Sequence, residues 1–152
     1  MEWIGPREAA QDFVVDNTWY EIKTIASSSE TVTISSLEQL DSDQQGELVV
    51  QYADKTSVTN QSGCTVNQLY KQLMELVESR VDLKQLLQNE LQKMGYLPIS
   101  YYDNFAFVFK ATSYYQVNAG FPALRRRKIP NSIAGAVYQI SLSAIEPFKK
   151  EG

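Results

Sequence analysis

The chain has 152 residues, a formal net charge of −4 and an isoelectric point near 4.9, and its length fits one domain. Hydrophobic residues make up 43% and charged residues 21% of the chain, so it can bury a core and is not intrinsically disordered. The acidic balance argues against non-specific coating of nucleic acid by the whole surface, but it leaves room for a local basic groove. No apolar run approaches the roughly 18 residues that span a bilayer, and the N-terminal residues lack the regions of a secretory signal. We therefore expect no membrane association and a cytoplasmic location.

Two residue counts exclude several classes of enzyme. The chain has no histidine and one cysteine, Cys64, so it cannot form a Ser-His-Asp triad, a Cys-His protease site or a histidine-metal nuclease site. It also cannot form an internal disulfide, a cysteine-rich zinc site or a CxxC redox pair, and it has no glycine-rich P-loop. Catalysis would have to use carboxylates, Lys, Arg, Tyr, Ser or Thr. A bound metal would be a hard cation such as Mg²⁺, Mn²⁺ or Ca²⁺.

The first third of the chain predicts strands and turns. β-Branched and aromatic residues predict strands, and Asp16-Asn17-Thr18 is a turn signal between the first two of them. The segment Ser36-Leu37-Glu38-Gln39 has the spacing of a capping box and predicts a short helical turn. The strands predicted here cover residues 11–15, 19–25, 31–35 and 47–52, with a loop at 26–30.

The rest of the chain predicts a polar loop, two helices and two strands. Residues 54–63 are loop-like. A second capping box, Thr65-x-x-Gln68, precedes leucines and valines at helical spacing. A further helix is predicted over residues 81–94, where Gly95 is its C-cap. Strands are predicted over residues 105–117 and 134–142. Strands, two helices and strands in this order favour a mixed sheet with helices on one face, an α/β or α+β domain.

Three residues of the second strand form the most informative pattern. Successive strand side chains point to opposite faces, so Glu21 and Lys23 share a face and Ile22 lies on the other. A two-residue type I′ turn would place Asp12 directly opposite Glu21, with their Cβ atoms roughly 4.5–5.5 Å apart. A three-residue loop without a bulge would instead put Asp12 on the opposite face.

This arrangement suits metal-dependent phosphodiester hydrolysis. Two like charges in direct opposition destabilise a hairpin, and a divalent cation between them removes that penalty. Asp12, Glu21 and the Ile22 carbonyl could hold Mg²⁺ or Mn²⁺, which acts as a Lewis acid and lowers the pKa of water. Lys23 would orient that water or offset charge on the phosphoryl group. An E-x-K tripeptide alone has a simpler interpretation, a solvated strand face with an ion pair, and that alternative stays open.

The spacing D-x8-E-x-K between two strands resembles the PD-(D/E)XK nuclease superfamily, which has the restriction-endonuclease-like fold. Further stretches resemble one bacterial PD-(D/E)XK family of unknown function, which occurs in restriction-modification and phage-defence gene clusters. Those stretches are residues 3–6, 11–13, 19–24, 34–41 and 120–122, and the sequence ISSLEQLD at 34–41 is the most distinctive.

The resemblance implies that Asp12 and Glu21 are the two motif acids and Lys23 the motif lysine, acting on DNA with Mg²⁺ or Mn²⁺. Gln11 stands where the motif has proline. Members of the family carry an N-terminal helix with an additional glutamate, and this chain begins almost at the motif. We therefore expect residues 1–152 to form a single restriction-endonuclease-like domain that lacks the N-terminal core helix and is the C-terminal part of a longer protein.

Two other patterns have competing interpretations. Arg125, Arg126, Arg127 and Lys128 form the main basic run and could contact DNA phosphates, or could be a solvated loop. The alternating aromatic residues at 105, 107 and 109 could stack on bases, but alternation favours a buried strand face.

The sequence thus supports two functions. The leading hypothesis is a metal-dependent DNA endonuclease of a restriction or phage-defence system. The alternative is a catalytically incomplete nuclease-fold subunit that acts in DNA binding or complex assembly. The expected partner is DNA, with a homodimer or defence-system proteins as further possibilities.

Overall fold

The structure is a computed structural model that describes residues 2–3 and 11–151. Most of the predicted strands and both predicted helices are present, so the mixed α+β class is confirmed. No helix among the described residues is long and apolar enough to cross a bilayer. The strands are β1 (Glu2–Trp3), β2 (Phe13–Val15), β3 (Thr18–Ile25), β4 (Thr31–Ile34), β5 (Gly46–Thr56), β6 (Cys64–Thr65), β7 (Ala106–Val117) and β8 (Tyr138–Ser141). The α-helices are α1 (Val66–Leu76), α2 (Val81–Lys93) and α3 (Leu142–Ile145), and the 3-10 helices are η1 (Ser100–Asn104), η2 (Arg126–Lys128) and η3 (Glu146–Phe148).

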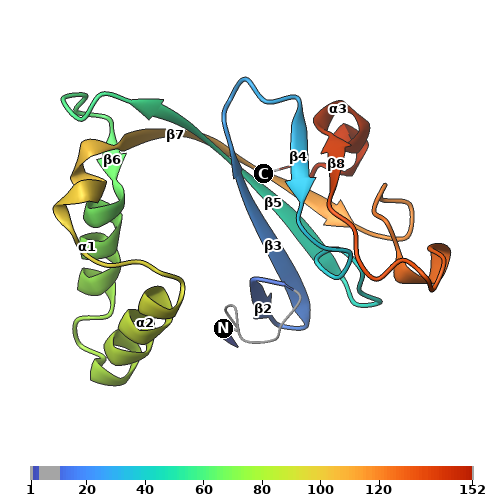
Figure 1. The fold of residues 1–152 in the computed structure, drawn as a ribbon, viewed down its shortest axis with the longest axis horizontal. Helices are drawn as coiled ribbons and strands as arrows, with labels where there is room; N and C mark the ends of the chain where they lie inside the picture. Colours follow the sequence, from blue (N-terminus) through green and yellow to red (C-terminus); the bar gives the residue numbers. More distant parts are fainter. Residues whose placement is uncertain (1, 4–10, 152) are drawn as a thin grey trace. The chain divides into compact units, whose positions relative to one another are not determined.

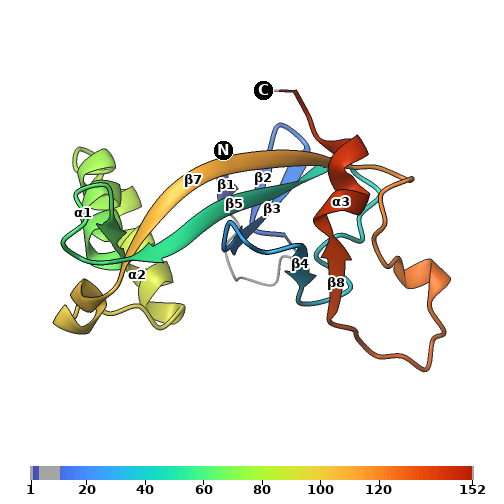
Figure 2. The ribbon, with the colours of Figure 1, turned by 90° about the horizontal axis from the view of Figure 1, so that it is seen from above.

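The larger sheet is mixed, with strand order β1-β2-β3-β5-β7-β6. Strand β3 pairs antiparallel with β2 and parallel with β5, beside which it runs in Figure 1. Strands β4 and β8 form a separate antiparallel pair, and α3 directly follows β8 (Figure 2). The chain between β3 and its parallel partner β5 therefore contains β4. Within the larger sheet, β3 lies between β2 and β5.

The described chain divides into two compact units. The first contains residues 1–52 and 110–152, and the second contains residues 53–109. Strands β5 and β7 each contribute residues to both units, and the single domain stays a prediction. The core of the first unit lies around Trp19, which is 1% exposed. The other buried members of this core are Val32, Ile34, Leu40, Leu48, Val50, Tyr115, Val117, Phe121, Ile140 and Ile145.

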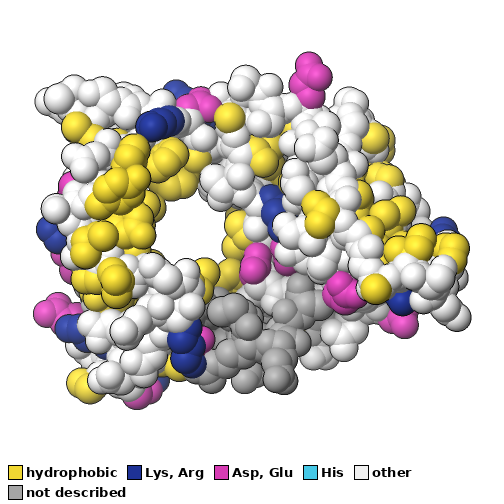
Figure 3. Space-filling model, in the orientation of Figure 1, with side chains coloured by type: hydrophobic (Ala, Val, Ile, Leu, Met, Phe, Trp, Pro, Cys, Tyr) yellow, Lys and Arg dark blue, Asp and Glu magenta, His cyan; other side chains and the backbone are white. Residues whose placement is uncertain are grey.

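The second unit is built around the predicted capping box. The Thr65 hydroxyl accepts a hydrogen bond from the Gln68 N–H, and the Gln68 side chain accepts one from the Thr65 N–H, so the predicted helix start is confirmed. The rings of Tyr70, Tyr96 and Tyr102 pack against one another in tilted pairs. The ring centroids of Tyr70 and Tyr96 are 5.2 Å apart, and those of Tyr96 and Tyr102 are 5.5 Å apart. Hydrophobic side chains nevertheless remain at the surface over the helices (Figure 3). This unit therefore buries little of its helices' apolar surface.

The chain differs from the predicted elements in three places. Residues 36–39 form bends and a turn rather than a helical turn, because the Gln39 amide accepts the Ser35 N–H. Strand β5 continues to Thr56, through residues predicted as loop. The last strand begins at Tyr138 rather than at residue 134.

The prediction of a buried aromatic face on β7 is wrong. Ala106 is 2% exposed, whereas Phe109 on the alternating aromatic side is 44% exposed. The Lys55 ammonium lies 4.7 Å from the centre of the Phe105 ring. A charged side chain, and not other hydrophobic side chains, therefore covers part of the aromatic side of the strand. The buried alternation appears farther along β7, at Ser113, Tyr115 and Val117.

Residues 4–10 lie outside the described residues. The prediction that the chain lacks the N-terminal core helix concerns this segment in part. The family-like residues 4–6 fall there as well. In the described part of the chain, the first helix is α1, which follows β6.

Candidate active site

The hairpin of β2 and β3 has the register that the sequence predicts. Val15 pairs with Thr18, and Phe13 pairs with Tyr20. Asp16 and Asn17 have φ angles of 48° and 65°, which are the left-handed values that a type I′ turn requires at both central positions. One step beyond Phe13, the Asp12 position therefore lies opposite Glu21. The charge of Asp12 is close enough to raise the pKa of Glu21; the use of both acids as a metal site stays a prediction.

Asp12 ends the strand pairing with its side chain. Its Oδ2 accepts a hydrogen bond of 2.8 Å from the Ile22 backbone N–H. In a continued antiparallel ladder, this N–H would have bonded to the backbone of the preceding residue, Gln11. The N–H and C=O of one strand residue point towards the same neighbouring strand, so the Ile22 carbonyl also faces the edge that carries Asp12. The Ile22 side chain points to the other face and is 40% exposed.

Glu21 is a buried carboxylate with one paired and one unpaired oxygen. The residue is 1% exposed, and its Oε1 lies 2.8 Å from the Lys23 Nζ. Its Oε2 is buried and has no hydrogen-bond partner among the described residues. Burial raises the pKa of Glu21, and the nearby charge of Asp12 raises it further, whereas the hydrogen bond and charge of Lys23 lower it. The site thus holds a carboxylate whose charge is only partly compensated.

Lys23 is held from both sides. Besides Glu21, its Nζ donates to the Oε1 of Gln39 at 3.0 Å, and this same oxygen accepts the Ser35 N–H at 2.7 Å. Sequence reasoning missed this role because it assigned Gln39 to a helix cap. Residues 23 and 39 belong to different elements, so no periodicity links them. Only the folding of β4 beside β3 brings the turn after β4 to the lysine.

The residues fit a divalent cation, with two side-chain ligands. Asp12 lies opposite Glu21 on the hairpin, and the Ile22 carbonyl faces the same edge. The buried Oε2 of Glu21 has no hydrogen-bond partner among the described residues and could coordinate a cation. Such hard oxygen donors suit Mg²⁺ or Mn²⁺, which keeps several waters beside one or two carboxylates. Among residues 2–3 and 11–151, no group of three or more His, Cys, Asp or Glu side chains is placed to hold a metal. Waters or substrate oxygens would complete the coordination shell.

The basic run splits into one buried residue and three exposed ones. Arg125 is 8% exposed, and its guanidinium donates to the carbonyls of Leu40, Ser42 and Asn118. Arg125 therefore connects residues 40–42 to Asn118, and its side chain is too buried to contact DNA.

The other three basic residues, Arg126, Arg127 and Lys128, form η2 and are exposed. The Asp41 carboxylate fixes the start of η2 by accepting the Arg126 backbone N–H at 2.9 Å. DNA contact by the basic run stays a prediction, and these three side chains are the ones that could make it.

Comparison with known proteins identifies a family. Residues 1–143 match the family model described as "Putative PD-(D/E)XK family member, (DUF4420)". No curated protein and no solved structure matches the chain. The family match covers the hairpin, the Gln39 turn and η2, and the fold is consistent with a restriction-endonuclease-like one. The acids and lysine of the D-x8-E-x-K pattern meet in that fold, and the chain belongs to this PD-(D/E)XK family.

Proposed function

We propose that the chain is a Mg²⁺- or Mn²⁺-dependent DNA endonuclease of a restriction or phage-defence system. The observation that carries the proposal is the buried, unpaired Oε2 of Glu21 beside Asp12 and Lys23. A buried carboxylate oxygen without a partner is costly, and a cation is the partner that would compensate it. The family membership supports the nuclease class.

The residues would divide the work of phosphodiester hydrolysis. A divalent cation held by Asp12, Glu21 and the Ile22 carbonyl would supply Lewis acidity and lower the pKa of a bound water. The Lys23 ammonium, fixed by Glu21 and Gln39, would orient the attacking water or stabilise charge on the phosphoryl group. Arg126, Arg127 and Lys128 would contact backbone phosphates, which position DNA without reading its sequence.

The direct test is nicking of supercoiled plasmid in Mn²⁺ by the wild type and by Lys23→Ala. Lys110→Ala is the control, because it removes an exposed lysine of the first unit that takes no part in the candidate site. We expect nicking by the wild type and by Lys110→Ala, and no nicking by Lys23→Ala although circular dichroism shows that this variant still folds. A fully active Lys23→Ala would overturn the mechanism.

One observation favours the second candidate, a catalytically incomplete nuclease-fold subunit that binds DNA or assembles a complex. In the described part of the chain only two acidic side chains meet at the site, and one of them is already ion-paired with Lys23. A gel shift of DNA that is insensitive to EDTA, without any cleavage in Mn²⁺, would favour this function over the endonuclease.

A further inference from the structure

Gln11, which stands where the nuclease motif has proline, makes a long-range contact with the turn after β4. Its side-chain Nε2 donates a hydrogen bond of 2.9 Å to the backbone carbonyl of Glu38. Proline has no side-chain donor for such a bond. Gln11 directly precedes Asp12 in the sequence. Glu38 likewise directly precedes Gln39, so the contact joins the segment that carries a motif acid to the turn that carries the partner of the motif lysine.

This contact completes a closed ring of hydrogen bonds around the candidate site. The Asp12 carboxylate accepts the Ile22 N–H at 2.8 Å. The Lys23 Nζ, on the next residue, donates to the Gln39 Oε1 at 3.0 Å, and the Gln11 side chain returns the ring to its start. The ring thus links three pairs of consecutive residues, namely 11–12, 22–23 and 38–39. Because each pair is bonded to both of the others, none of them can move away without breaking a hydrogen bond.

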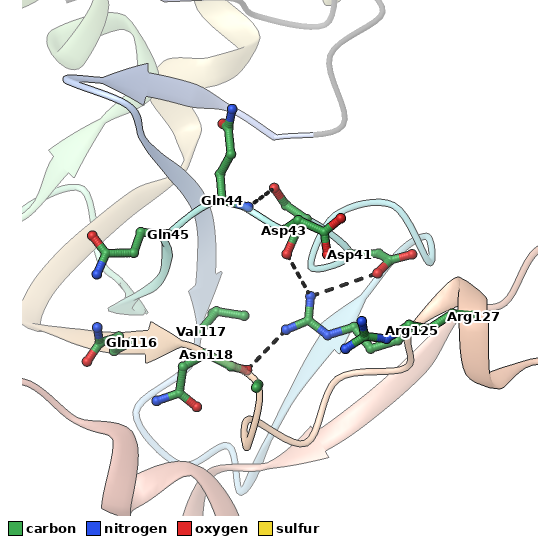
Figure 4. A pocket seen from close by; sticks show the side chains of 11 residues that line it. Asp41, Asp43, Gln44, Gln45, Gln116, Val117, Asn118, Arg125 and Arg127 are labelled. Atoms are coloured by element: carbon green, nitrogen blue, oxygen red, sulfur yellow. Dashed lines mark hydrogen bonds and ion pairs between the residues drawn. The ribbon is translucent and has the colours of Figure 1, made fainter.

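The turn in this ring is also fixed at its other end. The Glu38 carbonyl accepts the Asp41 N–H at 3.3 Å, which closes the turn. The buried Arg125 guanidinium donates to the carbonyl of Leu40 and, at 3.1 Å, to that of Asn118. Figure 4 shows this guanidinium between Asp41 and Asn118. The turn is therefore fixed to the first unit at residues 40–41, and Gln11 fixes it to the acid-bearing segment at residue 38.

The ring connects the two groups that the proposed reaction has to align. A cation would be held at Asp12, and the water that it activates would be oriented by Lys23. Asp12 is bonded directly to the backbone of β3, whereas the lysine ammonium lies at the end of a flexible stem. That ammonium is placed by Glu21 and Gln39. A shift of the turn relative to Asp12 would therefore move the ammonium relative to the cation, and small errors of this kind are costly for catalysis.

We propose that Gln11 is a positioning residue, which fixes the Lys23 ammonium relative to the cation site at Asp12. This inference rests on the proposed nuclease function and adds to it a residue that the motif itself does not contain. Gln11 acts through the turn and Gln39 and does not touch the substrate. Its loss should therefore slow the chemical step and leave the affinity for DNA unchanged.

The first experiment is single-turnover nicking of supercoiled plasmid at saturating DNA in Mn²⁺. Gln11→Leu keeps the size of the side chain and removes its donor, and Gln139→Leu makes the same change at an exposed glutamine on β8. We expect Gln11→Leu to nick about 3- to 10-fold more slowly with an unchanged Kd for DNA, and Gln139→Leu to keep the wild-type rate. A wild-type rate for Gln11→Leu, or a loss that lies in the Kd alone, would overturn the inference.

A double variant separates positioning of the lysine from a general structural role. If Gln11 acts through the turn, its side chain should matter only while Gln39 holds Lys23. We therefore expect Gln11→Leu/Gln39→Leu to nick within about two-fold of the rate of Gln39→Leu alone. If the two losses multiply, Gln11 acts independently of Gln39 and the inference is wrong.

The third measurement does not require cleavage. The Ser35 N–H donates to the Gln39 Oε1 at 2.7 Å, so its hydrogen exchange in EDTA, followed by NMR, reports how firmly Gln39 is held. We expect Gln11→Leu to speed this exchange several-fold and Gln139→Leu to leave it unchanged. Unchanged exchange in Gln11→Leu would overturn the inference. A wild type that does not nick would refute the nuclease proposal, and the exchange rate would still decide whether Gln11 holds the partner of the lysine in place.

Discussion

Gln39 and Lys23 are joined by a hydrogen bond of 3.0 Å, from the lysine Nζ to the glutamine Oε1. Because the same oxygen accepts the Ser35 N–H at 2.7 Å, the glutamine connects the lysine of β3 to the turn that follows β4. Lys23 therefore has a fixed position before any substrate arrives, and this matters for a group that must point at a reacting atom.

The loss of this connection should slow DNA nicking without abolishing it. A hydrogen bond to a charged group contributes about 1.5–3 kcal/mol, so we expect Gln39→Leu to lower the nicking rate roughly 10- to 100-fold. Gln39→Glu keeps an acceptor at the same place and should retain more of the rate than Gln39→Leu. Single-turnover nicking at saturating DNA measures this effect. Equal rates for Gln39→Leu and the wild type would mean that Glu21 alone positions the lysine.

The buried carboxyl of Glu21 should make stability depend on pH. Burial raises the pKa of Glu21 above its ordinary value of 4.5, so the folded chain binds this proton more tightly than the unfolded chain. The free energy of unfolding that Glu21 contributes therefore falls as the pH rises from about 4.5 through the raised pKa, and it is constant above that.

The measurement is urea denaturation of the wild type and Glu21→Gln between pH 4 and pH 8 in EDTA. The variant should gain stability relative to the wild type as the pH rises through this window. A variant that loses relative stability as the pH rises would show that the ion pair with Lys23 outweighs the burial of the carboxylate.

A divalent cation should stabilise the folded chain through the same two acids. A ligand that binds only the folded state at ten times its Kd adds about 1.4 kcal/mol. We therefore expect Mn²⁺ to raise the thermal midpoint of the wild type by a few degrees, and EDTA to reverse the shift. Asp12→Asn and Glu21→Gln should lose it, whereas Glu30→Gln, at an exposed acid, should keep it. An equal shift in all four proteins would place the cation elsewhere.

The hairpin and its acids could be predicted because they depend on local rules. A turn that needs two positive φ angles favours Asp16-Asn17, and the two-residue loop then fixes which residues face one another. The alternation along β3 places Glu21 and Lys23 on one face. These features involve neighbours in sequence, so composition and spacing carry the information.

The partners of those residues could not be predicted, because they come from distant segments. Gln39 reaches Lys23 only after β4 folds beside β3, and Arg125 is buried only because three carbonyls from residues 40–42 and 118 converge on it. A run of four basic residues looks like a surface patch in sequence. The structure shows that its first member has a different environment from the other three.

Gly46 packs against Trp19 so closely that no side chain fits there. A Cβ at position 46 would lie 1.8 Å from the Trp19 Cε2 and 2.1 Å from its Cδ2, and Trp19 is at the centre of the core. Extra volume in a well-packed core costs about 1–3 kcal/mol. We therefore expect Gly46→Ala to lower the free energy of unfolding by that amount, measured by urea denaturation. Gly135→Ala, where a Cβ meets nothing within 4 Å, should leave it unchanged, and Gly46→Ala/Trp19→Leu should cost less than the sum of its single changes. Strict additivity of the two changes would mean that the strain at Gly46 does not come from the Trp19 ring.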